Sequence, residues 1–211
     1  MFGPDPDAIY PNPAIPSVCF IKNVITRPTI KVGDYTYYDD NESPADFEKH
    51  VTHHYDFIGD DLIIGKFCAL GSGIEFIMNG ANHRMNSVTT YPFNIFGNGW
   101  EKATPNLDDL PFKGDTIIGN DVWFGQNVTV MPGVHIGDGS IIAANSTVTG
   151  DIPPYSVAGG NPCRLIKKRF DDDLIEYLLY LEWWNWDSEK IFNNLEILCS
   201  GDLSKIKSIA K

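Results

Sequence analysis

The stretch IGNDVWFGQNVTVMPGVHIGDGSIIAANSTVTGDI, residues 118–152, repeats one pattern every six positions. A large apolar residue opens each hexad: Ile118, Phe124, Val130, Ile136, Ile142 and Val148. Four positions after each of these stands an apolar or small residue: Val122, Val128, Val134, Ser140, Ser146 and Ile152. Three positions after each stands Gly, Asn or Asp: Asp121, Asn127, Gly133, Gly139, Asn145 and Asp151. Because these residue types tolerate a left-handed backbone, the chain is predicted to turn a corner once per hexad.

A parallel β-solenoid explains this period. An α-helix repeats near 3.6 residues and a strand repeats at 2, so neither gives six with a regular corner. In a solenoid, short strands on flat faces point apolar side chains into a core that stacked coils share. The same phase recurs upstream at Ile58, Ile64, Leu70 and Phe76, with corners expected at Asp61, Gly73 and Asn79. Phe67 stands at a corner position against this rule, and Cys68 falls on an inward position.

Residues 82–116 interrupt the repeat between the two blocks. An insertion of about 35 residues is long for a connection inside a compact domain, and such loops are usually functional or disordered. This one carries several aromatic side chains, which argues against disorder: Tyr91, Phe93, Phe96 and Trp100. We therefore expect this excursion loop to be ordered against another surface.

The pattern changes to helical spacing after Pro162. DDDLIEYLLYLEWW (171–184) and DSEKIFNNLEILCS (187–200) each begin with acidic capping residues and continue with apolar residues at helical intervals. They predict two helices that close the open end of the solenoid. The expected organisation is a β-helix domain over residues 1–170, with an irregular N-terminal segment at 1–30 and the excursion at 82–116. Residues 171–211 would form a C-terminal helical cap.

Composition excludes several classes of protein. The 211 residues carry a formal charge of −12, which argues against nucleic acid or an anionic membrane as the main partner. No apolar run approaches the ~20 residues of a membrane span, and MFGPDPDAIYPNPAIP does not resemble a signal peptide. The four cysteines form no C-x-x-C pair and are expected to be reduced thiols. A cytoplasmic location is predicted.

Several stretches resemble the hexapeptide-repeat acyltransferases, specifically the xenobiotic acetyltransferase branch with its Vat-type streptogramin A acetyltransferases. The resemblance is carried by FIMNGANHRM (76–85), YPFNIFGNGWEK (91–102), VMPGVHIGDGSIIAANSTV (130–148) and GGNPCRLIKKRF (159–170). It implies a left-handed parallel β-helix and a homotrimer with active sites between neighbouring subunits. It also implies acetyl-CoA-dependent transfer of acetyl to a hydroxyl of a streptogramin A antibiotic such as virginiamycin M1, which is thereby inactivated.

The catalytic base that this resemblance implies is His83. A base is needed because an alcohol hardly ionises near neutral pH, so its proton must be removed as its oxygen attacks the thioester. Imidazole, with an unperturbed pKa of ~6.5, can accept that proton and pass it to the departing thiolate. The transfer needs no acyl-enzyme, and the sequence holds no nucleophile motif of the G-x-S-x-G type.

The resemblance also implies the donor-site residues. Small residues of neighbouring coils would border the pantetheine arm of coenzyme A: Gly125, Ala143, Ala144 and Ser146. The basic run Lys167, Lys168 and Arg169 suits the nucleotide phosphates, and it also fits a charge cluster that flanks a helix. No metal is expected, because the H-x-x-H-H of residues 50–54 lies in an irregular acidic segment without a second motif.

A small-molecule acceptor would meet an apolar, aromatic pocket. By resemblance its walls are Tyr37, Tyr55, Pro105, Leu110 and Trp123. One departure from the family lies beside the base: HRMNSVTTYPF (83–93) is one residue longer than the usual HRMDGSTYPF, a change that could reshape the acceptor cleft.

Three alternative functions stay open at this point. An acetyltransferase of the same fold could act on another hydroxyl, such as that of chloramphenicol, a sugar or an amino acid. A γ-class carbonic anhydrase also uses this fold, but it needs three zinc-binding histidines, and the coils from Ile118 onward contain only His135. A structural solenoid would favour uninterrupted coils, whereas this chain carries a large aromatic excursion.

Overall fold

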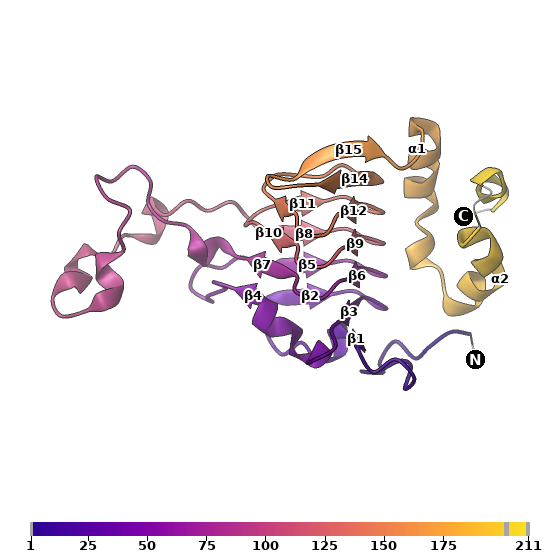
Figure 1. Cartoon of the computed structure of the whole chain (residues 1–211), viewed down its shortest axis with the longest axis horizontal. Coiled ribbons are helices and arrows are strands. Elements are labelled where there is room, and N and C mark those ends of the chain that lie inside the picture. The colour runs from indigo at the N-terminus through magenta and orange to yellow at the C-terminus, as the bar shows by residue number, and fades with distance from the viewer. Residues whose placement is uncertain (1, 201–202, 210–211) are drawn as a thin grey trace.

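The computed structural model describes residues 2–200 and 203–209, in which short strands stack into three sheets (Figure 1). Sheet A contains, in order, β1 (Val18–Phe20), β3 (Tyr37–Asp39), β6 (Ala69–Leu70), β9 (Trp123–Phe124), β12 (Ile141–Ile142), β14 (Ser156–Gly159) and β15 (Arg164–Lys168). Sheet B contains β11 (His135–Ile136), β8 (Thr116–Ile118), β5 (Leu62–Ile64) and β2 (Ile30–Val32). Sheet C contains β13 (Thr147–Val148), β10 (Thr129–Val130), β7 (Glu75–Ile77) and β4 (Val51–Thr52).

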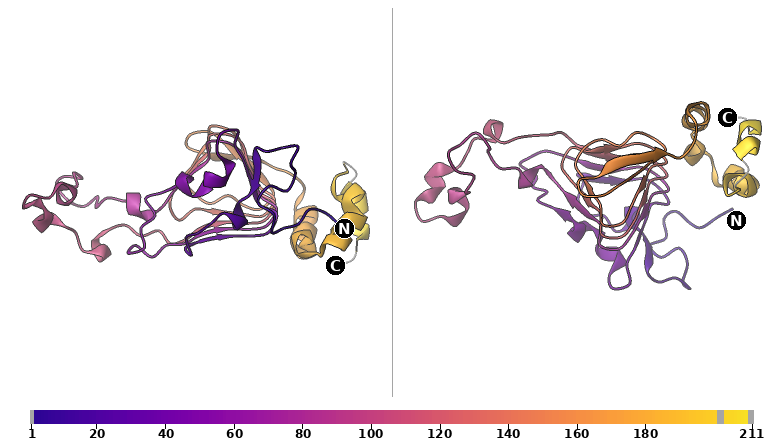
Figure 2. Two further views of the ribbon diagram at one scale, coloured as in Figure 1. Left: turned by 90° about the horizontal axis from the view of Figure 1, so that it is seen from below. Right: turned by 45° about the horizontal axis from the view of Figure 1, so that its top comes forward.

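The hexads stack in register, one strand on each face. Ile118 pairs in parallel with Ile136, which stands 18 positions later, so three hexads complete one coil. Phe124 pairs in the same way with Ile142. All six residues that open a hexad between 118 and 148 are at most 2% exposed. Figure 2 shows the three-sided outline that results. The sequence prediction of a parallel β-helix with these residues in its core is therefore confirmed.

Most of the predicted corners are also confirmed. The backbone is left-handed, with φ between 55° and 74°, at Gly73, Asp121, Asn127, Gly133, Gly139 and Asn145. The predicted left-handed backbone is not found at Asp61, Asn79 and Asp151, which do not have a positive φ. These residues use their side chains instead: the carboxylate of Asp151, for example, accepts a hydrogen bond from the backbone N–H of His135 at 2.8 Å.

Phe67 forms a corner although it is a bulky residue. Its φ is 58°, a conformation that is costly for such a side chain. Its ring stacks on Tyr35, with ring centroids 4.7 Å apart, and packs against Trp183 at 4.8 Å. These aromatic contacts offset the backbone cost, which explains how the corner persists without Gly, Asn or Asp.

The C-terminal helices begin where the sequence predicts. Asp171 caps α1 (Asp172–Leu181) by accepting a hydrogen bond from Leu174, and Asp187 caps α2 (Ser188–Leu198). Their position differs from the predicted cap, because α1 runs along one side of the stack rather than across its end (Figure 1). Leu174, Leu178 and Leu181 pack with Tyr155 beside the column of corners between sheets B and A. The apolar corner residues need this cover, whereas antiparallel β15 already ends sheet A.

The excursion leaves the coil after β7 and returns at β8. It passes through the short 3₁₀ helices η3 (Asn79–Ala81), η4 (Phe93–Phe96), η5 (Trp100–Ala103) and η6 (Leu107–Asp109). Figure 1 shows it reaching away from the stacked sheets. The remaining 3₁₀ helices are η1 (Ile21–Asn23), η2 (Pro44–His50), η7 (Trp183–Asn185) and η8 (Leu203–Ser208). None of the helices in the described residues combines the length and apolar content needed to cross a bilayer.

The stacking of the coils predicts an intolerant glycine at position 65. A Cβ there would lie 2.5 Å from the carbonyl oxygen of Gly119 on the next coil. We expect Gly65→Ala to lower the free energy of unfolding by about 3 kcal/mol, because one backbone must move away from the other. The matched control is Gly150→Ala, whose Cβ would meet open space. Denaturant titration at one protein concentration measures both, and equal stability of the two variants would contradict this account.

Candidate active site

One buried side-chain amide, that of Asn79, joins the two legs of the excursion at its root, where they leave and re-enter the coil. Asn79 is 3% exposed, and its Nδ2 donates to the carboxylate of Asp60 and to the carbonyl of Gly114, both at 2.8 Å. Its Oδ1 accepts from the backbone N–H of Lys113 at 2.8 Å. A single side chain therefore joins the outgoing leg of the loop to the returning leg and to the coil.

Asn82, which directly precedes the predicted base His83, extends this link. Its Nδ2 donates to Oδ1 of Asn79 at 3.1 Å and to the carbonyl of Pro111 at 2.9 Å. Sequence analysis did not predict this bridge. Pro111 lies on the returning leg, 29 positions away, so local sequence carries no signal for this contact.

His83 lies exposed on the outgoing leg, with its ring oriented by a backbone carbonyl. Its Nδ1 is 2.9 Å from the carbonyl oxygen of Thr90. A carbonyl can only accept, so Nδ1 carries the hydrogen and, in the neutral ring, Nε2 is left as the acceptor. This is the tautomer that a general base needs. Thr90 was missed by sequence analysis because any residue type could supply this carbonyl.

Three of the predicted acceptor residues lie on or beside the excursion. The ring of Tyr55 covers Gly80, where an added Cβ would approach it to 2.5 Å. Leu110 lines a hollow of about 400 Å³ at the root, with Ile58, Asn79, Leu107, Asp108, Pro111 and Phe112. Pro105 is half-buried within the loop. Phe57, which sequence analysis did not single out, stacks on Tyr55 with the ring planes 6° apart.

The other two predicted acceptor residues lie elsewhere on the same chain. Tyr37 and Trp123 are aligned on sheet A, where both pair with Ala69 between them. Tyr37 is half-buried, and this burial raises its pKa. The side chain of Trp123 is 56% exposed. The excursion leaves from the corner between sheets C and B, which is the corner opposite sheet A. One chain therefore does not bring Tyr37 and Trp123 to its own His83.

Three of the predicted donor-site residues gather at one edge of sheet A. Gly125 faces the next coil so closely that a Cβ would lie 2.6 Å from the backbone nitrogen of Ala144. Ala143 precedes it on that coil. The predicted donor-site role of Ser146 stays a prediction, and its side chain is 1% exposed. Its hydroxyl donates to the carbonyl of Ala143 at 2.6 Å and accepts from the N–H of Gly160 at 3.0 Å, so it already has partners within the coil.

The three residues of the basic run have different surroundings. Lys167 is exposed on β15, and its side chain forms no hydrogen bond or ion pair with the residues that the structure describes. Lys168 pairs with Asp172 at the start of α1. Arg169 donates to the carbonyl of Gly139 at 2.5 Å and lies over the Tyr155 ring, so its guanidinium has partners within the coil.

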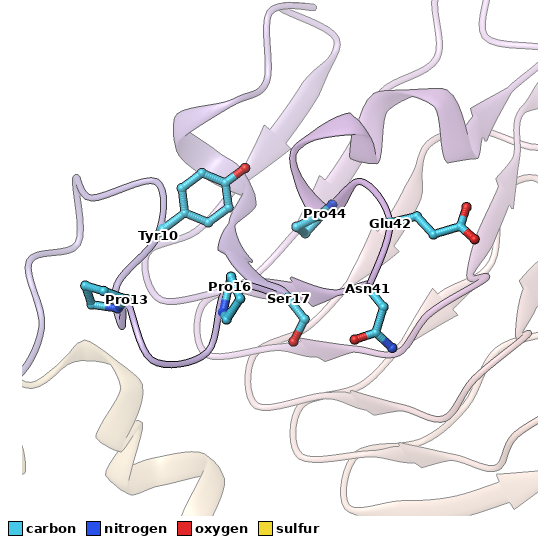
Figure 3. A pocket seen from close by; sticks show the side chains of 7 residues that line it. All are labelled: Tyr10, Pro13, Pro16, Ser17, Asn41, Glu42 and Pro44. Atoms are coloured by element: carbon cyan, nitrogen blue, oxygen red, sulfur yellow. The ribbon is translucent and has the colours of Figure 1, made fainter.

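Two other histidines have structural partners, and a second hollow lies apart from the predicted site residues. His50 contacts the hydroxyl of Tyr38, and Nε2 of His54 contacts the carbonyl of Asp60 at 2.8 Å. Within residues 2–200 and 203–209 no three His, Cys, Asp or Glu side chains converge as metal ligands. A hollow of about 590 Å³ lies between the N-terminal segment and residues 41–44 (Figure 3), and no predicted site residue lines it.

Known transferases are similar to this chain in sequence. Residues 115–150 match the model of the bacterial transferase hexapeptide, described as six repeats. A virginiamycin A acetyltransferase of Staphylococcus aureus is 54% identical over 205 residues, or 97% of this chain and 93% of that protein. A probable macrolide acetyltransferase of Lysinibacillus sphaericus is 68% identical over 162 residues, or 77% and 90%. A chloramphenicol acetyltransferase of Klebsiella aerogenes is 44% identical over 183 residues, or 85% and 86%.

These relatives are matched over most of their own length, and the hexads that the family model matches are those that form the stacked coils. The names of all three relatives state the same reaction class. The chain therefore belongs to the bacterial hexapeptide-repeat transferases, and it is an acetyltransferase.

Proposed function

We propose that this enzyme transfers acetyl from acetyl-CoA to a hydroxyl of a streptogramin A antibiotic, with His83 as the general base. The proposal rests on the orientation of the His83 ring. Its Nδ1–H donates to the Thr90 carbonyl, so Nε2 is left as the acceptor. The ring is exposed on the surface, so a hydroxyl can approach Nε2 directly.

The mechanism is direct transfer between the two substrates. Acetyl-CoA supplies the acetyl thioester. Nε2 of His83 takes the proton of the acceptor hydroxyl as its oxygen bonds to the acetyl carbon, and the same nitrogen returns that proton to sulfur as the C–S bond breaks. While Nε2 holds the proton, the Thr90 carbonyl stabilises the imidazolium through Nδ1–H.

The edge of sheet A fits the donor. Gly125 has no side chain and Ala144 is exposed, so a thin pantetheine arm could lie along this edge and reach backbone groups. Lys167 on β15 offers an exposed positive charge for a phosphate. Ser146 and Arg169 would support the coil around this edge, because their polar atoms already have internal partners.

We propose a homotrimer, and the separation of the two halves of the site supports an assembly in which they meet. His83 and Tyr55 lie at the corner between sheets C and B, whereas Trp123 and Gly125 belong to the opposite face. The excursion also exposes large apolar residues, which water covers poorly: Met85, Val88, Tyr91, Ile95, Phe96 and Trp100. We propose that these residues pack on a neighbouring subunit, so that each active site combines His83 of one copy with sheet A of the next.

The acceptor is proposed from the character of the surface near the base. Tyr55, Phe57 and Leu110 present aromatic and aliphatic groups, which suit a large apolar macrocycle. The match over 97% of the chain to a virginiamycin A acetyltransferase favours the same choice. Acetylation of chloramphenicol is the second candidate, supported by the 44% identity to an enzyme of that name.

We predict that His83→Ala lowers turnover by ~10²–10⁴, the usual contribution of a general base. The residue is exposed, so the thermal transition and the assembly state should not change. His135→Ala is the matched control, because His135 is also exposed but lies on β11. Turnover near the wild-type rate in folded, assembled His83→Ala enzyme would refute the role of His83.

The acceptor is tested by release of free thiol from acetyl-CoA. We expect release with virginiamycin M1 that requires both substrates, and an acetyl ester in the product by mass spectrometry. Chloramphenicol and a hydroxylated macrolide are assayed in parallel at the same concentrations. Release with chloramphenicol but none above background with several streptogramin A compounds would replace the proposed acceptor by the second candidate.

A further inference from the structure

We infer that Asn79, fixed by the carboxylate of Asp60, is a positioning residue for His83. This inference rests on the proposed role of His83 as the base. In this inference, a buried polar group at the root of the loop sets the position of the His83 ring. This group does not itself touch the reacting atoms.

The side-chain amide of Asn79 has its hydrogen-bonding capacity filled from three directions. Nδ2 donates to Asp60 and Gly114, while Oδ1 accepts from Lys113 and Asn82, with all four distances between 2.8 and 3.1 Å. Rotation of the amide would break several of these bonds at once. The legs at residues 79–82 and 111–114 therefore keep one separation and one direction.

Asp60 connects this amide to the coil. It is 1% exposed, and its Oδ2 accepts from both the backbone N–H and Nδ2 of Asn79 at 2.8 Å. Its backbone carbonyl accepts from Nε2 of His54, and the carbonyl of His54 accepts from Arg27. Its Oδ1 is buried without a hydrogen-bond partner among the described residues, so the carboxylate depends on the two N–H groups of Asn79.

The connection to His83 is short. Asn82 bridges Asn79 and the returning leg, and it directly precedes His83. Gly80 has no freedom to shift inward, because an added Cβ would lie 2.3 Å from the carbonyl of His53. Beyond this root the excursion points away from its own coil (Figure 1), so the root sets the direction in which the base projects.

The first test compares Asn79→Ala with a coil residue of similar burial. Thr36→Val is the control, because the Thr36 hydroxyl is fully buried, donates to Gly65 at 2.6 Å and accepts from Cys68 at 3.0 Å. Both variants should lose stability. At a temperature where both remain folded and assembled, we expect only Asn79→Ala to lower kcat, by about 10- to 100-fold. The KM for acetyl-CoA should stay within about twofold in both.

The second test is the double variant His83→Ala/Asn79→Ala. If Asn79 acts through the base, its removal has little left to affect, and the double variant should stay within about threefold of His83→Ala. A purely structural role would make the two losses multiply. If Asn79→Ala fails to fold, Asp60→Asn carries the same test, with an expected loss of about 3- to 10-fold from its weaker hydrogen bonds.

The outcomes separate the two proposals. Wild-type kcat in folded Asn79→Ala, or a further tenfold loss in the double variant, would overturn the positioning role while the assignment of His83 stands. Near-normal turnover in His83→Ala itself would instead overturn the proposed function on which this inference rests.

Discussion

The contact of backbone on backbone between successive coils is the constraint on which the rest depends. Each coil lies so close to the next that a single Cβ at Gly65 or Gly125 would overlap it. Strands of two or three residues are too short to be stable alone, and they persist because each is paired in register on its neighbours. This regularity gives sheet A the edge along which we propose that the donor lies.

The stacked coils also determine where the chain can leave the regular pattern. The corners between sheets B and A keep left-handed residues and are covered by the C-terminal helices. At the corner between sheets C and B, Gly133 keeps this backbone, whereas Asp61, Asn79 and Asp151 do not, and their side chains form hydrogen bonds or ion pairs instead. The excursion begins at this corner. The chain exchanges one regular turn for a loop that carries His83 outward on a buried polar root.

The parts of this structure that sequence could predict are those with a local code. The hexad places Ile118 and Phe124 in the core because spacing alone decides which way a side chain points. The Phe67 corner and the Asn79 root escaped prediction because both depend on partners distant in the chain, such as Trp183 and Lys113. The role of His83 was predicted from family resemblance, since a lone histidine has no distinguishing pattern. The burial of Ser146 was not predicted, because a small polar residue is equally suited to the core and to the surface.

The central claim is that each active site uses His83 of one copy and sheet A of another, and mixed assemblies test it most directly. His83→Ala removes the base, and Ala144→Arg, at an exposed position, obstructs the donor edge without entering the core. Each variant alone should be inactive. The account predicts that co-assembly of the two restores acetyl transfer, because some interfaces then pair an intact base with an intact edge. Mixed assemblies, verified by mass spectrometry, that remain as inactive as the separate variants would contradict it.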